Sequence, residues 1–293
     1  MGAASACAPS LSDLRKEIPP DKTQFDLALL DGDPQGRLVV IRRLCQPLAS
    51  PAQQRLGFHL ARRAAEQSNP SKSAVQQTPA FAENLELARC AALIAADAET
   101  PPGEQLAFLE EGIAAAQKAG SEAVLAGTCA APSTDSTSAR APDPPSVSPC
   151  GENTARAAYV HAVLAGQKMR LAGMTEALRL LGDELALLNA AQAVPDEDMG
   201  GPLRLLGFIY LKAPAWPAGP GDLDRSLELL QTAVKRHPSH PLNHLFLAAV
   251  LNEDGDREAA AAEIALGLKL ADERLWGRQA IQWRDLDALT AVR

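Results

Sequence analysis

Residues of matching character recur 34 positions apart near the C-terminal end of this 293-residue chain. The recurring pairs are Ser226 and Ala260, Leu230 and Ile264, Ala233 and Gly267, and Pro238 and Asp272. A period of this length is typical of a helix–turn–helix unit that is repeated along the chain. One such unit cannot bury its apolar face alone, so several units must stack. The spacing therefore predicts a row of helix pairs.

Turn residues place two of these pairs. The predicted helices are 202–212 with 223–237, and 241–253 with 256–270. Pro238 cannot continue a helix, whereas Pro241 suits the first turn of the next one. Gly255 can adopt the positive φ that ends a helix, and Asp256 can cap the helix that follows.

Side-chain size also follows the repeat. Small residues are expected where the two helices of a pair cross, and large ones where neighbouring pairs meet. The small positions are Gly207, Ala233, Ala248, Ala260 and Gly267, and the large ones are Leu206, Tyr210, Leu230 and Ile264. Gly207 and Ala248 are equivalent but lie 41 positions apart. The first unit is therefore longer than the period, and its extra residues fit in the loop 213–221.

These positions resemble the tetratricopeptide pattern. The segments 200–207, 212–217, 221–222 and 241–248 further resemble tetratricopeptide proteins grouped with the T component (TatT) of bacterial TRAP transporters. The resemblance covers about residues 196–271. It implies an all-α fold of tetratricopeptide-like antiparallel helix-pair repeats that form an α-solenoid. Members of that family are often periplasmic lipoproteins thought to assist solute uptake.

Composition agrees with an all-α fold. Apolar residues make up 46% of the chain but aromatic residues only 4%, which favours packed helices over strands. Further helices are predicted at 25–30, 37–48, 53–66, 81–98, 106–119, 154–172 and 175–191. The expected organisation is a flexible segment 1–22, helical hairpins 23–126, a Pro/Ser/Thr-rich loop 127–153 and C-terminal repeats 154–293.

Charge argues against nucleic-acid binding, and hydropathy argues against a membrane-spanning helix. The net charge of −8 disfavours general nucleic-acid binding, because an acidic chain repels phosphate backbones. No apolar run approaches the roughly 20 residues that span a bilayer. Cys7, after Ala4-Ser5-Ala6, resembles the end of a lipoprotein signal, so membrane attachment through a lipidated Cys7 is one interpretation. The other is an ordinary disordered tail.

The cysteines bear on the compartment. None of the five forms a C-x-x-C pair, which argues against a zinc or thioredoxin-type site. Cys129 and Cys150 bracket a Pro/Ser/Thr-rich segment, and a disulfide there would staple the loop at a gain of about 3 kcal/mol. That arrangement favours export to the periplasm. The alternative is a cytoplasmic protein with reduced cysteines.

Catalytic and metal-binding patterns are weak. His237, His240 and His244 fall in the turn between repeats, without a nearby carboxylate or cysteine in the sequence to complete a metal site. No phosphate-binding glycine loop or nucleophile elbow is present. We therefore expect no metal, no cofactor and no enzymatic activity.

A binding groove is expected on the first helices of the repeats. In the repeat register its lining comprises Arg204, Phe208, Leu211 and Lys212 from one unit, and Leu245, Ala249, Asn252 and Glu253 from the next. Arg204 and Lys212 could hold a carboxylate or an acidic segment. Trp216, between two prolines, either covers the helix pair or presents a binding surface, and the covering role is favoured.

These features predict a non-enzymatic binding or scaffold protein with a concave groove for a protein or peptide partner. The alternative function is a periplasmic accessory component of a TRAP-type transporter that binds a small organic ligand. An enclosed apolar cavity would favour the transporter role, whereas an open groove would favour a protein or peptide.

Overall fold

The computed structural model describes residues 34–67, 78–126 and 149–284. These residues form twelve α-helices and no β-strand, which confirms the predicted all-α class for this part of the chain. The helices are α2 (Pro34–Leu44), α3 (Pro51–Gln67), α4 (Thr78–Ala96), α5 (Pro102–Ala126), α6 (Pro149–Ala172), α7 (Met174–Ala191), α8 (Gly201–Lys212), α9 (Leu223–Arg236), α10 (Pro241–Asp254), α11 (Arg257–Leu270), α12 (Glu273–Trp276) and α13 (Arg278–Arg284).

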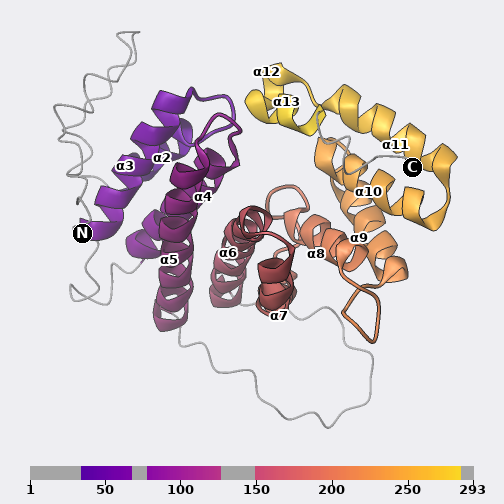
Figure 1. The fold of residues 1–293 in the computed structure, drawn as a ribbon. Coiled ribbons are helices and arrows are strands. Elements are labelled where there is room, and N and C mark those ends of the chain that lie inside the picture. Colours follow the sequence, from indigo (N-terminus) through magenta and orange to yellow (C-terminus); the bar gives the residue numbers. More distant parts are fainter. Residues whose placement is uncertain (1–33, 68–77, 127–148, 285–293) are drawn as a thin grey trace.

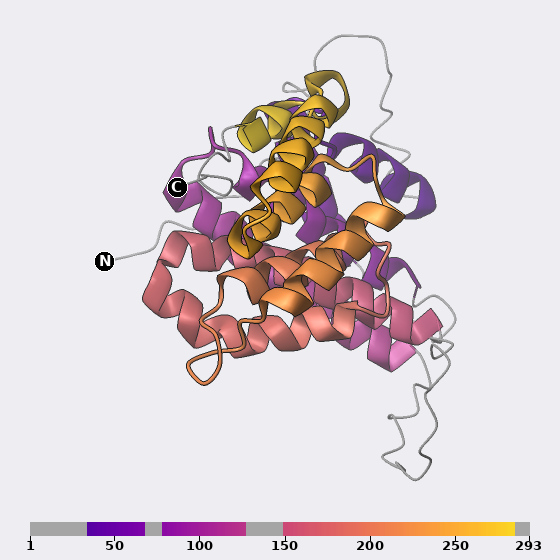
Figure 2. The same ribbon diagram turned by 90° about the vertical axis from the view of Figure 1, so that its right-hand side faces the viewer.

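Helices that follow one another in the chain pack side by side. The most extensive contacts join α4 to α5, α5 to α6, α10 to α11 and α6 to α7. Figure 1 shows the helices following an arc, with α2 and α3 at one end and α12 and α13 at the other. The view in Figure 2, turned by 90°, brings the last helices in front of the earlier ones. The order of the helices in space thus follows their order in the sequence.

The predicted helix pairs near the C-terminus match the observed bounds closely. Helices α8, α9, α10 and α11 begin and end within one residue of the predicted ranges. The helix predicted at 37–48 starts earlier, at Pro34, and stops at Leu44. The helix expected at 25–30 and the flexible segment 1–22 lie outside the described residues.

Side-chain caps explain where the later helices start. Asp222 accepts a hydrogen bond from the backbone N–H of Arg225, and Asp256 accepts one from Ala259. Each bond satisfies an N–H group that has no partner inside its helix. Gly255 ends α10 with a φ of 92°, in the left-handed region that favours glycine. Both roles agree with the sequence prediction for Gly255 and Asp256.

Two glycines allow the paired helices to approach closely. A Cβ at Gly207 in α8 would lie 2.8 Å from Cγ of Leu230 in α9. A Cβ at Gly267 in α11 would lie 2.9 Å from Cγ of Leu245 in α10. Ser226 adds a hydrogen bond from its hydroxyl to the carbonyl oxygen of Gly207, at 2.8 Å. In each pair, a leucine of one helix therefore fills the space that the glycine of the other helix leaves by having no side chain.

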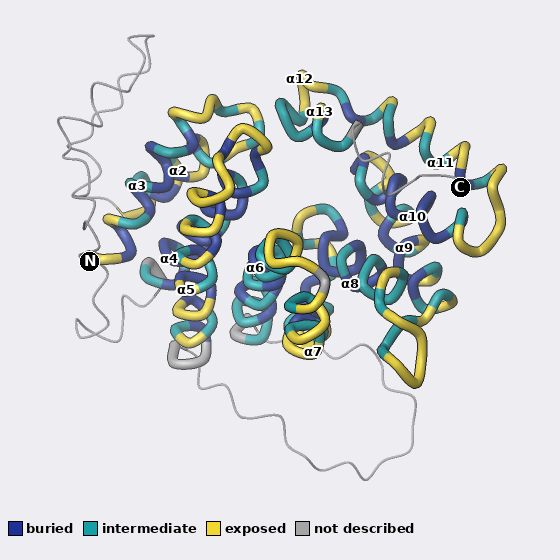
Figure 3. The backbone as a smooth tube through the Cα atoms, viewed as in Figure 1, coloured by how far each residue is buried: buried dark blue, intermediate teal, exposed yellow. Residues whose placement is uncertain are grey.

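The hydrophobic core runs through successive helices. One cluster extends from Ile41 to Ala191, a second from Ala162 to Ala233, and a third from Leu230 to Val250. The partly buried Leu205 in α8 contacts all three. In Figure 3 the buried residues lie where helices face one another and the exposed ones lie on the outside. The helices before and after residues 127–148 thus share a single packed interior.

Candidate functional site

The structure places Arg204 in the interior, which corrects its assignment to a groove. Its side chain is 4% exposed. Nη1 donates to Oδ1 of Asn243 at 2.8 Å, and Nη2 donates to Oδ2 of Asp198 at 2.9 Å. The physical reason is that the segment before α8 folds back and supplies a carboxylate to this guanidinium.

The predicted lining of α10 needs a similar correction. Leu245 is 2% exposed because it fills the space beside Gly267, and Ala249 is 3% exposed. Asn252 is half-buried and Glu253 is exposed. The first turns of α10 therefore contribute to the core, and the last turn provides its accessible groove candidates.

The end of α8 retains accessible candidates. Phe208 and Leu211 are half-buried and Lys212 is exposed. Phe208 stacks on Phe246 with ring centroids 4.7 Å apart and an angle of 27° between the planes. Nζ of Lys212 lies 6.0 Å from the centroid of the Phe208 ring. An aromatic pair and an ammonium group are thus brought together between α8 and α10.

Trp216 does not cover the helix pair, contrary to the favoured expectation. Its side chain is 85% exposed, and the loop that carries it projects from the array in Figures 1 and 3. The loop is nevertheless ordered, because the N–H of Gly221 donates to the carbonyl oxygen of Pro214 and that of Asp222 to Tyr210. A Cβ at Gly219 would lie 2.6 Å from the carbonyl oxygen of Pro214. The folded loop directs its indole away from the core.

The segment between α7 and α8 falls between two helices predicted from the sequence, 175–191 and 202–212, and forms a junction. Three consecutive carboxylates there bind different partners. Asp196 accepts hydrogen bonds from Arg236 and contacts His237, Glu197 pairs with Arg89 and Arg156, and Asp198 accepts from Tyr159 and Arg204. These partners come from α4, α6, α8 and α9 and from the residue after α9. The acidic junction, residues 196–198, therefore ties together helices that are distant in sequence.

The backbone of this junction is unusual. Asp198 and Met199 both have a φ of 49°, and Gly200 has a φ of 90°. The left-handed region costs a non-glycine residue roughly 1–2 kcal/mol. A Cβ at Gly201 would lie 2.9 Å from Cε2 of Tyr159, so the ring requires a glycine at that position. The surrounding ion pairs and the close tyrosine hold this backbone in place.

Electrostatics around the junction follow from burial and charge. Burial raises the pKa of Tyr159 well above its ordinary value, and the neighbouring Asp198 carboxylate adds to the effect. Hydrogen bonds from Arg236 and His237 lower the pKa of Asp196 to about 2. Near neutral pH, Tyr159 is therefore a neutral donor and Asp196 an ionised acceptor.

The histidine cluster forms no metal site in the described part of the chain, where no group of three or more potential ligands is found. Nδ1 of His244 lies 2.6 Å from Oε2 of Glu263, and Nε2 lies 2.7 Å from the carbonyl oxygen of Pro238. His240 is 2% exposed, and burial followed by the charge of Arg204 lowers its pKa to about 3. The His244 ring is thus used in hydrogen bonding, whereas the His240 ring packs against Trp276 and Trp283.

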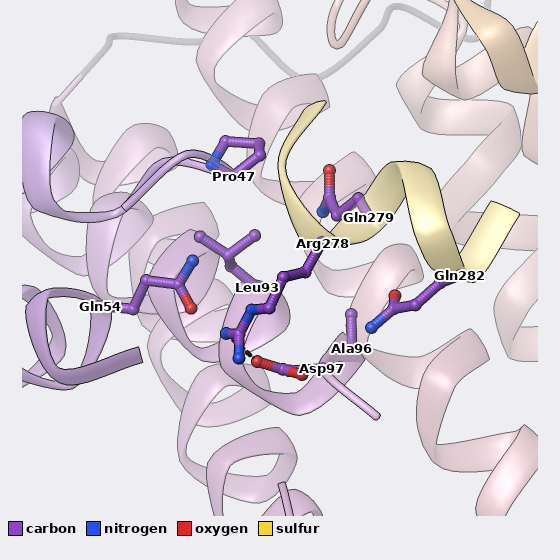
Figure 4. Close-up of a pocket in the computed structure, with 8 residues that line it drawn as sticks. All are labelled: Pro47, Gln54, Leu93, Ala96, Asp97, Arg278, Gln279 and Gln282. Carbon is purple, nitrogen blue, oxygen red and sulfur yellow. Dashed lines mark ion pairs between the residues drawn. The ribbon is translucent and has the colours of Figure 1, made fainter. Parts of the chain in front are cut away.

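A small cleft separates the first helices from the last (Figure 4). Its lining comprises Pro47, Gln54, Leu93, Ala96, Asp97, Arg278, Gln279 and Gln282. An ion pair between Arg278 and Asp97 crosses it. The surroundings are mainly amide and charged groups, so the cleft lacks the apolar lining typical of a small-molecule pocket.

The cysteines give a different disulfide from the one expected. Cys45, which follows α2, is bonded to Cys90 in α4, with Cα atoms 5.2 Å apart. Cys90 is fully buried. Cys7 and Cys129 lie outside the described residues, as does the side chain of Cys150. The staple between Cys129 and Cys150 therefore remains a prediction.

Sequence reasoning missed the acidic junction, although one signal was present. The run Asp196-Glu-Asp198 is followed by Met199, by two glycines and, three residues after them, by Arg204. Its distant cationic partners, such as Arg89, could be found only from the fold. No helix in the described residues has the length and apolar character needed to cross a membrane.

Comparison with protein-family models and with curated proteins gives no match to this chain.

Proposed function

We propose that this chain is a non-enzymatic, tetratricopeptide-like α-solenoid that binds a protein or peptide partner. The observation that carries the proposal is the repeated cap. Asp222 and Asp256, 34 positions apart, each accept a hydrogen bond from the N–H three residues later. The period seen in the sequence thus coincides with equivalent positions in two successive helix pairs, as in repeat proteins that bind partners along an extended surface.

The proposed contact surface is the α8–α10 surface, defined by Phe208, Leu211, Lys212 and Asn252. It excludes Arg204 and Leu245, which are buried. Phe208 supplies an aromatic face and Lys212 an exposed positive charge. Aromatic residues commonly contribute much of the binding energy at protein interfaces, and the ammonium favours a segment that carries a carboxylate.

A photo-crosslinking experiment tests this surface. A photoreactive amino acid would replace Asn252 in one variant and the exposed Gln231 of α9 in another. We expect a discrete crosslinked product from position 252 that is lost when Lys212→Glu is added, and no such product from position 231. Equal products from both positions, or no effect of Lys212→Glu, would contradict the proposal.

We also propose that the protein works in an oxidising compartment such as the periplasm. The disulfide between Cys45 and Cys90 supports this, because such bonds persist mainly in exported proteins. Pairing of these two leaves three cysteines, so at least one of Cys7, Cys129 and Cys150 has no intramolecular disulfide partner. The odd number of cysteines agrees with a Cys7 that carries a lipid instead of a disulfide. Mass analysis of the N-terminal peptide from membrane fractions would test it, and an unmodified peptide would refute it.

The same compartment suits the alternative role as an accessory component of a TRAP-type transporter. The resemblance of residues 196–271 is its main support. A calorimetric titration with small organic acids would distinguish the two roles, since saturable binding that persists in Lys212→Glu would favour the transporter role.

A further inference from the structure

The last two helices contact the first helices of the chain. Nη1 of Arg278 lies 2.9 Å from Oε2 of Glu99, and the same guanidinium pairs with Asp97. Asp97 and Glu99 lie in the turn between α4 and α5. The Asp97 side chain is 10% exposed, so this ion pair is shielded from solvent more than a typical surface pair. Figure 4 shows the two side chains meeting across the cleft.

The backbone approaches closely at the same place. Gly277 has a φ of 55°, and a Cβ there would lie 3.1 Å from the carbonyl carbon of Pro47. Pro47 belongs to the turn between α2 and α3. The left-handed glycine thus lets the segment at residue 277 lie directly against the turn between α2 and α3.

On their other side, the same two helices contact the residue just before α10. The rings of Trp276 and Trp283 lie 4.8 and 5.7 Å from the ring of His240, and their own centroids are 5.1 Å apart. His240 is the residue just before α10 and is buried. Residues 273–284, the closing segment, are therefore the end of the arc that meets its first helices while it stays in contact with His240.

The closing segment has little core of its own. Among its described side chains only Ala280 is buried, while Leu275 and Ile281 are 66% and 46% exposed. A segment with few buried apolar contacts can separate from its neighbours at a small fraction of the total stability. Its attachment to the first helices relies instead on one guanidinium and one backbone contact.

We propose that the closing segment is a reversible clasp, which closes the arc of helices into a ring when Arg278 pairs with Asp97 and Glu99. Glu99 is 77% exposed, so salt screens its pair with Arg278. The fraction of open molecules therefore rises with ionic strength. The aromatic contacts with His240 keep the segment attached beside the start of α10 when the ring opens. The inference concerns the conformation of the chain and does not depend on the proposed binding function.

Distance measurements between two spin labels would test the clasp. The labels, introduced as non-natural amino acids so that the cysteines stay intact, replace the exposed residues Ala52 in α3 and Ile281 in α13. At low salt we expect one short distance. In Arg278→Ala the population with a longer distance should rise on the order of tenfold, the factor that corresponds to about 1.4 kcal/mol.

Two controls separate opening from general loss of structure. Arg274→Ala removes an 89% exposed arginine of the same segment that pairs with Asp272, and it should leave the distance unchanged. Gly277→Ala should open the ring, whereas Gly255→Ala, at a φ of 92° with nothing within 4 Å, should not. Helical circular dichroism checks that each variant is folded. An unchanged distance in folded Arg278→Ala and Gly277→Ala and at 1 M salt, where the Debye length is only about 3 Å, would overturn the proposal.

Discussion

Arg204 of α8 donates a hydrogen bond to Asn243 of α10 at 2.8 Å, which joins the first helices of two successive pairs. The amide nitrogen of Asn243 donates in turn to carbonyl oxygens, including those of Met199 and His237. A position that the repeat register assigned to a groove is thus an internal tie between repeats. Arg204 also binds the acidic junction, and Asn243 binds the turn after α9.

Replacement of Arg204 should therefore reduce stability rather than affect binding selectively. Arg204→Ala leaves the buried Asn243 oxygen and the Asp198 carboxylate without their cationic donor. A hydrogen bond to a charged group contributes about 1.5–3 kcal/mol, so a loss of about 3 kcal/mol is expected in urea unfolding. Arg225→Ala, which removes an exposed pair within α9, is the control and should change stability little. Equal stability of the two variants would contradict the assigned role.

Two glycine-to-alanine substitutions should have opposite effects. Gly207→Ala places a Cβ 2.8 Å from Leu230 and forces the pair apart, at a cost of about 1–3 kcal/mol. Gly182→Ala in α7 meets nothing within 4 Å and should stabilise the helix by about 0.5–1 kcal/mol. Thermal unfolding of both variants checks the result. If both substitutions stabilise the protein, the close approach of α8 and α9 is wrong.

Glu184 in α7 should make stability depend on pH. Its side chain is buried, Oε2 has no hydrogen-bond partner among the described residues, and burial raises its pKa from 4.5 to about 8. Between these values the folded state binds more protons than the unfolded state, so stability falls as pH rises, by about 1.4 kcal/mol per pH unit. Below about pH 4.5 the loss is absent.

Glu184→Gln removes this titration, so the variant should gain stability relative to the natural chain as pH rises from 5 to 8. The difference between the two proteins isolates Glu184 from His240, whose lowered pKa acts in the opposite direction. A constant difference across that range, measured by urea unfolding, would show that Glu184 ionises normally.

The disulfide can be tested by peptide mapping without reductant. We expect one peptide that joins Cys45 to Cys90 in protein prepared from the periplasm. Replacing both by serine should cost about 2–4 kcal/mol, since the bond closes a sequence separation of 45 residues. A peptide that joins Cys45 to another cysteine would contradict the pairing. A second peptide that joins Cys129 to Cys150 would support the additional staple expected from the sequence.

Helix bounds near the C-terminus were predictable because they depend on local residues. Asp222 and Asp256 cap the helix immediately after them, and Gly255 supplies its own positive φ. The small residue Gly207 at the crossing of α8 and α9 also follows the repeat register, although the register placed Leu230, its contact there, between neighbouring pairs. These features need only the period and the conformational preference of each residue type.

The orientation of Arg204 was not predictable because it depends on a loop that the register does not describe. Asp198 reaches the guanidinium only through two left-handed residues in succession. Similarly, Cys45 meets Cys90 because α2 packs against α4, and cysteine connectivity cannot be deduced from sequence alone. The exposure of Trp216 follows from the turn that Gly219 and Gly221 form against Pro214.

Asp222 and Asp256 make the same capping hydrogen bond, to the N–H three residues later, and this has a consequence for how the chain can be shortened or lengthened. Excision of residues 223–256 would place Asp222 directly before Arg257, where its carboxylate could accept from the same N–H groups that Asp256 now serves. Duplication of residues 223–256 would likewise place an aspartate cap directly before the first helix of the second copy. The unit of insertion or deletion in this chain is therefore 34 residues from cap to cap, a length at which internal duplication leaves every helix start intact.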